Sequence, residues 1–242
     1  MNFKKIEAKM KALYAPRAER YRMDDEVDIN LNHHQRIAQK LEHLTSSFGR
    51  PITVLDVGCG TGRYFYCLEN VEKLVGLDLS QEMLNLARDP LKAEKLSIKE
   101  MELRCDNVYT TEFPPESFDL IYSFGVFGNG CAVTPELCGQ FYNWLKPNGK
   151  IFFDAFDIFG VPFRRKIQIL TRNFIYRLLP ESLQDKWDQK SKWLPFFLVS
   201  KRQLNRLMEK NQFFEVTIDS HLCQLTKGPG YKLECLAVKG AS

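Results

Sequence analysis

The sequence has 242 residues, of which 44% are hydrophobic and 26% charged, and its net charge is +4. This balance indicates one large globular domain, and no apolar run approaches the ~20 residues of a membrane-spanning helix or forms the apolar stretch of an N-terminal signal peptide. The seven cysteines include no C-x-x-C pair, which favours reduced thiols in a cytoplasmic protein and argues against a disulfide framework or a structural zinc site.

The charge is unevenly distributed along the chain. Residues 1–22 carry a net charge of +5, residues 159–210 carry +8, and the remainder therefore sums to −9. Two interpretations stay open: the basic segments form solvated helix faces, or they attract an anionic partner.

The first part of the chain predicts strands that alternate with helices. Short runs rich in apolar residues predict five strands at 52–57, 73–79, 101–105, 118–124 and 150–156, the first two of them buried. Helices are expected over 63–70, after Ser80 as N-cap, and from Thr134 to about Leu145, with a turn at 146–149. Such alternation is typical of βαβ units and a mostly parallel sheet.

The C-terminal end breaks this rhythm. Ser200 and Gln203 form the sequence of a capping box, and the helix that follows should end at Lys210 with Asn211 in the left-handed conformation. Strands are expected at 213–220 and 231–238. The ten residues between them are too few for a crossover helix, so this pair should be antiparallel. The count becomes seven strands, the last one reversed.

A glycine-rich turn follows the first strand, in "VLDVGCGTGRY" at 54–64. Its G-x-G-x-G spacing differs from the dinucleotide fingerprint and from a phosphate-binding P-loop. Asp56 would repel a pyrophosphate and suits a ligand with positive charge. Asp78 ends the second strand 22 residues later, where a carboxylate can accept both hydroxyls of a ribose. The expected ligand has a ribose and a cationic group but no phosphate.

Five segments together give a resemblance to a known family. They are "VLDVGCGTG" (54–62), "GLDLSQEML" (76–84), "CDNV" (105–108), "FPPESFDLI" (113–121) and "LKPNGKIFF" (145–153). Over residues 52–156 the chain resembles class I S-adenosylmethionine (SAM)-dependent methyltransferases of the small-molecule type. The resemblance implies a Rossmann-like three-layer α/β sandwich whose seven-stranded, mostly parallel sheet ends in an antiparallel strand, with SAM as cofactor and S-adenosylhomocysteine as product.

The resemblance also implies cofactor-binding residues around the methionine, ribose, adenine and sulfonium parts of SAM. They are Asp56, Gly58, Cys59, Gly60, Thr61, Gly62, Asp78, Leu79, Met83, Asp106, Asn107, Val108, Phe124, Gly125 and Arg36. Structural alternatives stay open for three of them: Asp78 as a helix cap, Asp106 as a turn residue and Phe124 as an ordinary core aromatic.

The segment before the first strand supplies the candidate catalytic residues. Relatives often fold an N-terminal helix over the cofactor, with a tyrosine or arginine near the methionine carboxylate, and Tyr14, Tyr21 and Arg36 are available here. Tyr21, His33 and His34 are the catalytic candidates. The two histidines are neighbours about 100° apart on a helix, so only one can face the site, and solvent or a structural hydrogen bond is the alternative. Their spacing is wrong for a helical metal pair, and no metal site is expected.

We expect one methyltransferase domain with four parts. They are an N-terminal helical cap (1–50), a SAM-binding core (51–157), a helical lid insertion between strands five and six (158–199), and a C-terminal helix with a β-hairpin (200–242). The lid segment has an amphipathic basic stretch and an aromatic-rich turn. It could cover an acceptor, pack structurally on the sheet, or lie on an anionic membrane.

The predicted function is methyl transfer from SAM to an O, N or C atom of a small molecule by in-line displacement. Two alternatives are a methyltransferase acting on a macromolecule or membrane-borne lipid through the basic segments, and a SAM-binding regulator without activity. The motif "SFGVFGN" after the fourth strand lacks the [DN]-P-P-[FY] signature, so a nucleic-acid target is not expected. The acceptor, the atom methylated and the oligomeric state are left open.

Overall fold

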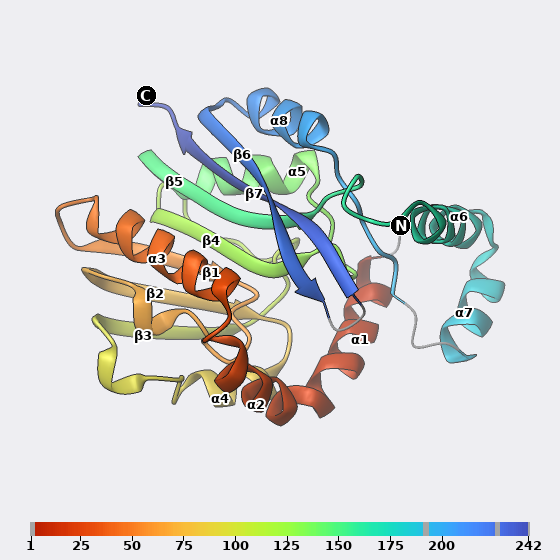
Figure 1. Ribbon diagram of the computed structural model, residues 1–242, viewed down its shortest axis with the longest axis horizontal. Coiled ribbons are helices and arrows are strands. Elements are labelled where there is room, and N and C mark those ends of the chain that lie inside the picture. The colour runs from red at the N-terminus through yellow and green to blue at the C-terminus, as the bar shows by residue number, and fades with distance from the viewer. Residues whose placement is uncertain (1–2, 191–193, 226–227, 242) are drawn as a thin grey trace.

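The structure is a computed structural model that describes residues 3–190, 194–225 and 228–241. A seven-stranded sheet with the order β3-β2-β1-β4-β5-β7-β6 lies between two layers of helices (Figure 1). The pairs among β1 to β5 are parallel, whereas β7 runs antiparallel to both β5 and β6. The predicted Rossmann-like sandwich with a reversed last strand is confirmed.

The strands agree with the predicted positions, and most are longer at one or both ends. They are β1 (Ile52–Val57), β2 (Val71–Asp78), β3 (Ile98–Cys105), β4 (Phe118–Phe127), β5 (Leu145–Phe156), β6 (Phe213–Leu225) and β7 (Gly228–Lys239). The predicted turn at 146–149 is wrong as an interruption, because β5 already begins at Leu145, which pairs with Phe118. Asn148 keeps a turn-like φ of 61° within the strand.

The helices are α1 (Phe3–Tyr14), α2 (Ala18–Asp28), α3 (Asn32–Ser46), α4 (Gln81–Ala87), α5 (Pro135–Trp144), α6 (Phe163–Leu178), α7 (Glu181–Lys190) and α8 (Lys201–Lys210), with short 3-10 turns η1 (Ala15–Arg17), η2 (Phe65–Cys67) and η3 (Ala93–Lys95). Three helices, α4, α5 and α8, begin at the predicted caps. The hydroxyls of Ser80 and Thr134 accept backbone N–H bonds as N-caps, and Ser200 with Gln203 forms the capping box.

Two local predictions are wrong. The helix expected over 63–70 is only the turn η2, because β2 begins at Val71 and the intervening residues must also return the chain to the edge of the sheet. Leu68 is already extended, and Asn70 has a positive φ of 55°. At the end of α8, Asn211 has a φ of −94°, and the left-handed residue is its neighbour Gln212 with a φ of 64°.

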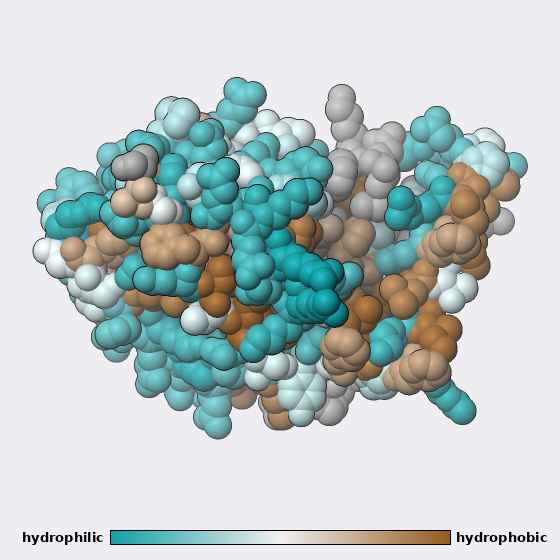
Figure 2. Space-filling model, turned by 90° about the horizontal axis from the view of Figure 1, so that it is seen from above, coloured by the Kyte–Doolittle hydropathy of each residue, from teal (hydrophilic) through white to brown (hydrophobic). Residues whose placement is uncertain are grey.

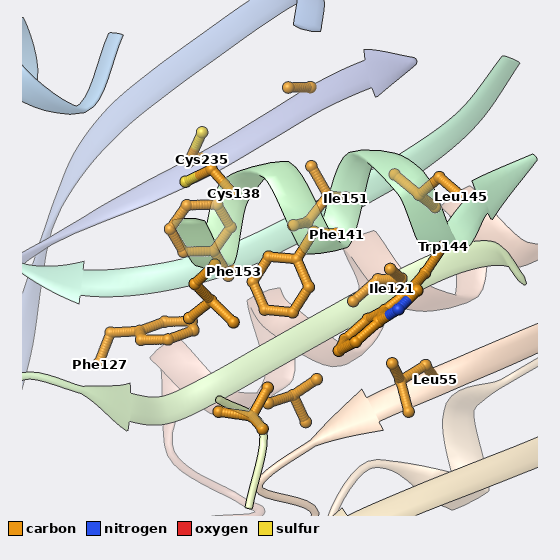
Figure 3. Packing of buried hydrophobic residues seen from close by; sticks show 14 of the residues in the cluster. Leu55, Ile121, Phe127, Cys138, Phe141, Trp144, Leu145, Ile151, Phe153 and Cys235 are labelled. Carbon is orange, nitrogen blue, oxygen red and sulfur yellow. The ribbon is translucent and has the colours of Figure 1, made fainter. Parts of the chain in front are cut away.

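Neighbouring residues of the central strands point to opposite faces of the sheet and build two cores. Leu55, Ile121 and Phe153 pack with α5 and α8 on one face. Figure 3 shows Phe141 and Trp144 of α5 against the strand side chains of this cluster. The residues just before those three, Val54, Leu120 and Phe152, pack with α3 and α4 on the other face.

The helices that lie outside the sheet and its two cores, α1, α6 and α7, contact one another through side chains of α1. The α1 residue Lys5 pairs with Asp185 of α7 at 2.7 Å, and Lys9 lies over the ring of Tyr176 in α6. Isolated bridges attach the segment after α7 to the core, Asn129 to Phe196 and Asp157 to Val199. Within the described part of the chain, no helix is long and apolar enough to cross a membrane.

Candidate active site

A cavity lies at the carboxyl ends of β1, β2, β3 and β4, where ligands of open α/β sheets bind. Helices α1 and α2 form its outer wall. The predicted residues that line it are Tyr21, Asp56, Gly58, Cys59, Gly60, Thr61, Asp78, Leu79, Met83, Asp106, Asn107, Val108, Phe124 and Gly125. The structure thus brings together most of the residues selected from five separate sequence segments.

The Asp78 carboxylate is held at the end of β2 by two backbone groups. Gly60 donates its N–H to Oδ2 at 3.0 Å, and Ser80 donates its N–H to Oδ1 at 2.9 Å. Each carboxylate oxygen keeps acceptor capacity, because an oxygen of this kind offers two lone pairs. Burial raises the pKa of Asp78, against the effect of these hydrogen bonds. Asp78 therefore fixes the glycine turn and can still accept hydroxyls from the cavity.

Asp56 lies deeper, at the end of β1. The residue is only 4% exposed, and burial raises its pKa to about 8. A cationic group in the cavity would favour the ionised form of this carboxyl. Its neighbour Cys59 is also buried, which raises the pKa of the thiol well above its usual value. Cys59 is therefore a small apolar wall of the cavity, without the thiolate character that reactivity needs.

Asp106, Asn107 and Val108 follow β3 and form the far end of the cavity. The N–H of Asn107 donates to the carboxylate of Asp106 at 2.7 Å, and the Asn107 amide donates to Glu7 of α1 at 2.8 Å. Met83, on the inner face of α4, is buried beside the same end. This end has an apolar surface with a few polar groups, which suits a flat heteroaromatic ring.

Two tyrosines from the N-terminal segment complete the outer wall. The Tyr14 hydroxyl accepts a hydrogen bond from the Asn129 amide at 2.9 Å, and the rings of Tyr14 and Tyr21 lie 5.9 Å apart. Burial raises the pKa of Tyr14 to about 12 and also raises that of Tyr21. Both hydroxyls are therefore protonated near neutral pH and can donate a hydrogen bond into the cavity.

Helix α2 is fastened to the glycine turn by a buried carboxylate. Asp25 accepts a hydrogen bond from the Thr61 hydroxyl and forms an ion pair with Arg63. Burial raises the pKa of Asp25, and the nearby Arg63 opposes that rise. Arg63, which follows the last glycine of the motif, thus attaches α2 to the glycine turn and does not serve as a phosphate contact.

Four predicted residues lie outside the cavity. Gly62 does not line it; its φ is +78°, and a Cβ there would meet the Phe65 ring at 2.8 Å, so this glycine serves the turn. Arg36 points instead to β7, where Nη1 donates to the buried Glu234 at 2.6 Å. This position does not support the role expected for Arg36 at the methionine carboxylate.

The two histidines also lie outside the cavity lining. Buried His34 contacts the Tyr64 hydroxyl through Nδ1 at 2.5 Å, and Arg63 lies 2.9 Å from its Nε2. The same Arg63 nitrogen lies 3.2 Å from Nδ1, and because a guanidinium only donates, the neutral ring is the acceptor in this contact. Burial, followed by the charge of Arg63, lowers the pKa of His34 to about 2. The ring of His33 lies 3.8 Å from that of His34, tilted by 43°. His34 makes the structural hydrogen bond that was the alternative to a catalytic role.

The sequence predicts an N-terminal helix over the cofactor and makes Tyr14 available there, but it does not identify the other residues that α1 contributes. Ile6, Glu7 and Met10 line the cavity together with Lys11 and Tyr14. Their i, i+3, i+4 spacing was the available signal, but it does not say which part of the fold the helix covers. Asn129 and Gly130, just beyond β4, also line the cavity and were not selected. Among the described residues, no cluster of three or more His, Cys, Asp or Glu could hold a metal ion.

Residues 54–149 match a family model described as a methyltransferase domain, over the segment that carries the glycine turn, Asp78 and the Asp106 loop. This segment is therefore similar to the methyltransferase-domain family. The chain is 39% identical to phosphoethanolamine N-methyltransferase 3 of Arabidopsis thaliana over 100 residues, which are 40% of this chain and 20% of that protein. The similarity thus spans about a fifth of the first such relatives.

Two further comparisons extend the similarity beyond this segment. The chain is 29% identical to demethylmenaquinone methyltransferase of Lactococcus lactis over 152 residues, 58% of each chain. The solved magnesium protoporphyrin IX methyltransferase of Synechocystis with bound S-adenosylhomocysteine shares the fold, with a TM-score of 0.63 at 11% identity. That comparison covers 97% of this chain and all of the solved one.

Proposed function

We propose that this protein transfers a methyl group from SAM to an O, N or C atom of a small-molecule acceptor. The observation that carries the proposal is the Asp78 carboxylate, held by Gly60 and Ser80 at the edge of the cavity with acceptor capacity left for a ribose. The relatives named for phosphoethanolamine and demethylmenaquinone support a small-molecule acceptor, without identifying it.

The residues of the cavity fit SAM in shape and charge. Gly60 and Gly125 line the cavity with positive φ values, and a Cβ on either would meet nothing within 4 Å and would project into open space. The backbone can therefore approach a ligand closely there. Asp56 would hold a cationic group of the methionine portion, Asp78 the ribose, and Asp106 with Asn107 the polar edge of the adenine.

When bound, SAM supplies a methyl group on a sulfonium that is already an activated leaving group. The protein's contribution is then to align acceptor and methyl, and such alignment can provide roughly 7–11 kcal/mol of the barrier. Phe124 contacts Tyr64 and Phe152 edge-on, so its ring is fixed at the cavity wall. Helices α1 and α2 form the outer wall of the cavity.

Tyr21 is the candidate acceptor-contacting residue within the cavity lining. Its raised pKa keeps the hydroxyl protonated, so it would orient the acceptor by donating a hydrogen bond rather than by removing a proton. Tyr21→Phe should lower kcat by up to about 10-fold, because a lost hydrogen bond of this kind costs about 0.5–1.5 kcal/mol. SAM affinity should stay within about threefold of the wild type, and a parallel loss of SAM affinity would assign Tyr21 to the cofactor instead.

The proposed activity is tested by incubating the protein with methyl-labelled SAM and a metabolite extract. Label should enter a low-molecular-weight fraction, and Asp78→Ala should abolish that transfer at limiting SAM. If SAM binds by calorimetric titration but no fraction takes the label, the protein is a SAM-binding regulator. Label in a macromolecular or lipid fraction would favour the alternative acceptors. Excess chelator should leave the rate unchanged, because the sulfonium needs no metal to leave.

A further inference from the structure

Helix α6 carries an apolar stripe that the rest of the protein leaves largely exposed. The stripe consists of five apolar residues spaced three or four positions apart, which places them on one side of a helix. They are Phe163, Ile167, Leu170, Phe174 and Leu178. They are exposed to 70%, 47%, 47%, 64% and 68%, respectively. A helix normally buries such a stripe against its own fold, so this one calls for a partner.

The opposite side of α6 is the one that packs on the protein. Asn173 donates its amide to the backbone carbonyl of Phe196 at 2.7 Å, and Tyr176 is buried with Lys9 of α1 over its ring. The helix is therefore already attached through its polar and aromatic side. Figure 2 shows hydrophobic residues gathered at the end of the molecule that α6 and α7 occupy in Figure 1.

The apolar surface continues beyond the stripe. Phe159, in the loop before α6, is 78% exposed, and Lys166 lies near the rings of both Phe159 and Phe163. A groove bordered by Leu170, Phe174, Pro195 and Phe197 runs along the stripe. Contiguous exposed apolar surface of this kind marks an interaction site.

The charge of α6 identifies the partner. The helix contains Arg164, Arg165, Lys166, Arg172 and Arg177 and no acidic residue. Two copies of this face pressed together would oppose like charges, which disfavours self-association. A bilayer with anionic lipids matches both features of the helix. Its apolar interior can accommodate the stripe, and its phosphates can attract the arginines. Sixteen residues of helix extend over roughly 24 Å, enough to lie along such a surface.

We propose that α6 docks the protein on an anionic lipid bilayer, with the apolar stripe inserted at the headgroup boundary and Arg164, Lys166 and Arg177, which flank the stripe, among the phosphates. The helix lies in the membrane plane and does not span the bilayer. Because α1 contacts α6 and also lines the cavity, docking holds the cavity wall close to the membrane. This inference goes beyond the proposed methyl transfer and does not depend on it.

The test is sedimentation with vesicles of phosphatidylcholine alone and of phosphatidylcholine mixed with phosphatidylglycerol, in the absence of SAM. The wild type should sediment with the mixed vesicles, less with the neutral ones, and less again at high salt. Phe163→Glu/Phe174→Glu should weaken binding to mixed vesicles about tenfold or more. The matched control is Met23→Glu/Val27→Glu, which changes two apolar residues of α2 that are 66% and 67% exposed, and it should keep most of the binding.

A second pair of variants separates the charges. Arg164→Glu/Arg177→Glu should reduce binding to the mixed vesicles, whereas Lys201→Glu/Arg202→Glu on α8 makes the same change in net charge and should have a smaller effect. Circular dichroism and SAM titration verify that each variant folds. The proposal is overturned if the wild type does not bind the mixed vesicles, if stripe and control variants lose binding equally, or if the stripe variants instead dissolve a dimer seen by ultracentrifugation.

Discussion

The backbone N–H of Gly60 donates a 3.0 Å hydrogen bond to the Asp78 carboxylate and so joins the turn after β1 to the end of β2. The two residues therefore stabilise each other: the glycine turn orients the carboxylate toward the cavity, and the carboxylate fixes the conformation of the turn. Their spacing of 18 residues is bridged by β2, which lies beside β1 in parallel register.

Asp78→Ala should lower the affinity for SAM by about 10- to 150-fold, because a lost hydrogen bond to a charged group costs about 1.5–3 kcal/mol. Calorimetric titration of both proteins measures the difference. Asp78→Asn keeps one acceptor oxygen and should lose less. Asp89→Ala, at an exposed carboxylate after α4, is the matched control and should bind like the wild type. Unchanged affinity in Asp78→Ala would remove Asp78 from the binding site.

Asp56→Asn should change how stability depends on pH. The pKa of Asp56 is raised from 3.8 to about 8 in the folded protein, so unfolding releases a proton between these values. Stability from this group is therefore full below pH 3.8 and decreases as the pH rises to about 8. Urea unfolding without SAM should show a smaller loss toward pH 8 in Asp56→Asn than in the wild type. Identical slopes would mean that Asp56 is already ionised in the folded state.

His34 should contribute an opposite dependence on the acid side. Burial lowers its pKa from 6.5 to about 2, so the unfolded chain takes up a proton that the folded protein excludes. Stability is then lost as the pH falls below 6.5. His34→Asn should flatten that slope and cost about 1–3 kcal/mol at neutral pH through its lost hydrogen bonds. His43→Asn, on the exposed side of the same helix, should leave both quantities unchanged.

Arg36→Ala should destabilise the fold while leaving SAM affinity within about threefold. Burial would raise the pKa of Glu234, but the hydrogen bonds from Arg36 outweigh it and the pKa is lowered. Removing Arg36 leaves a buried carboxylate, at a cost of about 2–3 kcal/mol, below the usual 3–5 because Lys40 remains nearby. Adding Glu234→Gln should recover part of the loss in urea unfolding. A large loss of SAM affinity in Arg36→Ala would return this arginine to the cofactor.

The sequence predicts those parts of the site that depend on local patterns. Gly58, Gly60 and Asp56 follow directly from the end of a buried strand, and Asp78 from the end of the next one, because parallel strands align their carboxyl ends. Gly62 was grouped with the other glycines, although its Cβ position faces Phe65. The spacing of the motif does not distinguish a glycine that contacts the ligand from a glycine that only forms the turn.

Long-range packing explains the predictions that failed. No sequence pattern around Arg36 predicts its pairing with Glu234. Glu234 lies 198 residues away, and the two residues meet only when the fold brings α3 and β7 together. The wall formed by Glu7 and Met10 likewise depends on where α1 crosses the sheet edge. The helix expected after Gly62 was limited by the distance back to Val71, which local propensity does not include. The lid role of residues 158–199 stays a prediction, and residues 191–193 lie outside the described part.

The ion pair between Arg36 and Glu234 joins a helix near the start of the chain to a strand near its end. A ribosome releases the N-terminal helices long before β7, so α3 must wait for almost the entire chain before its arginine meets the buried carboxylate. Until then the first strands can associate, but the inner face of α3 lacks its last anchor. A nascent chain stalled before residue 234 should therefore expose α3 to proteases, and extension past β7 should protect it.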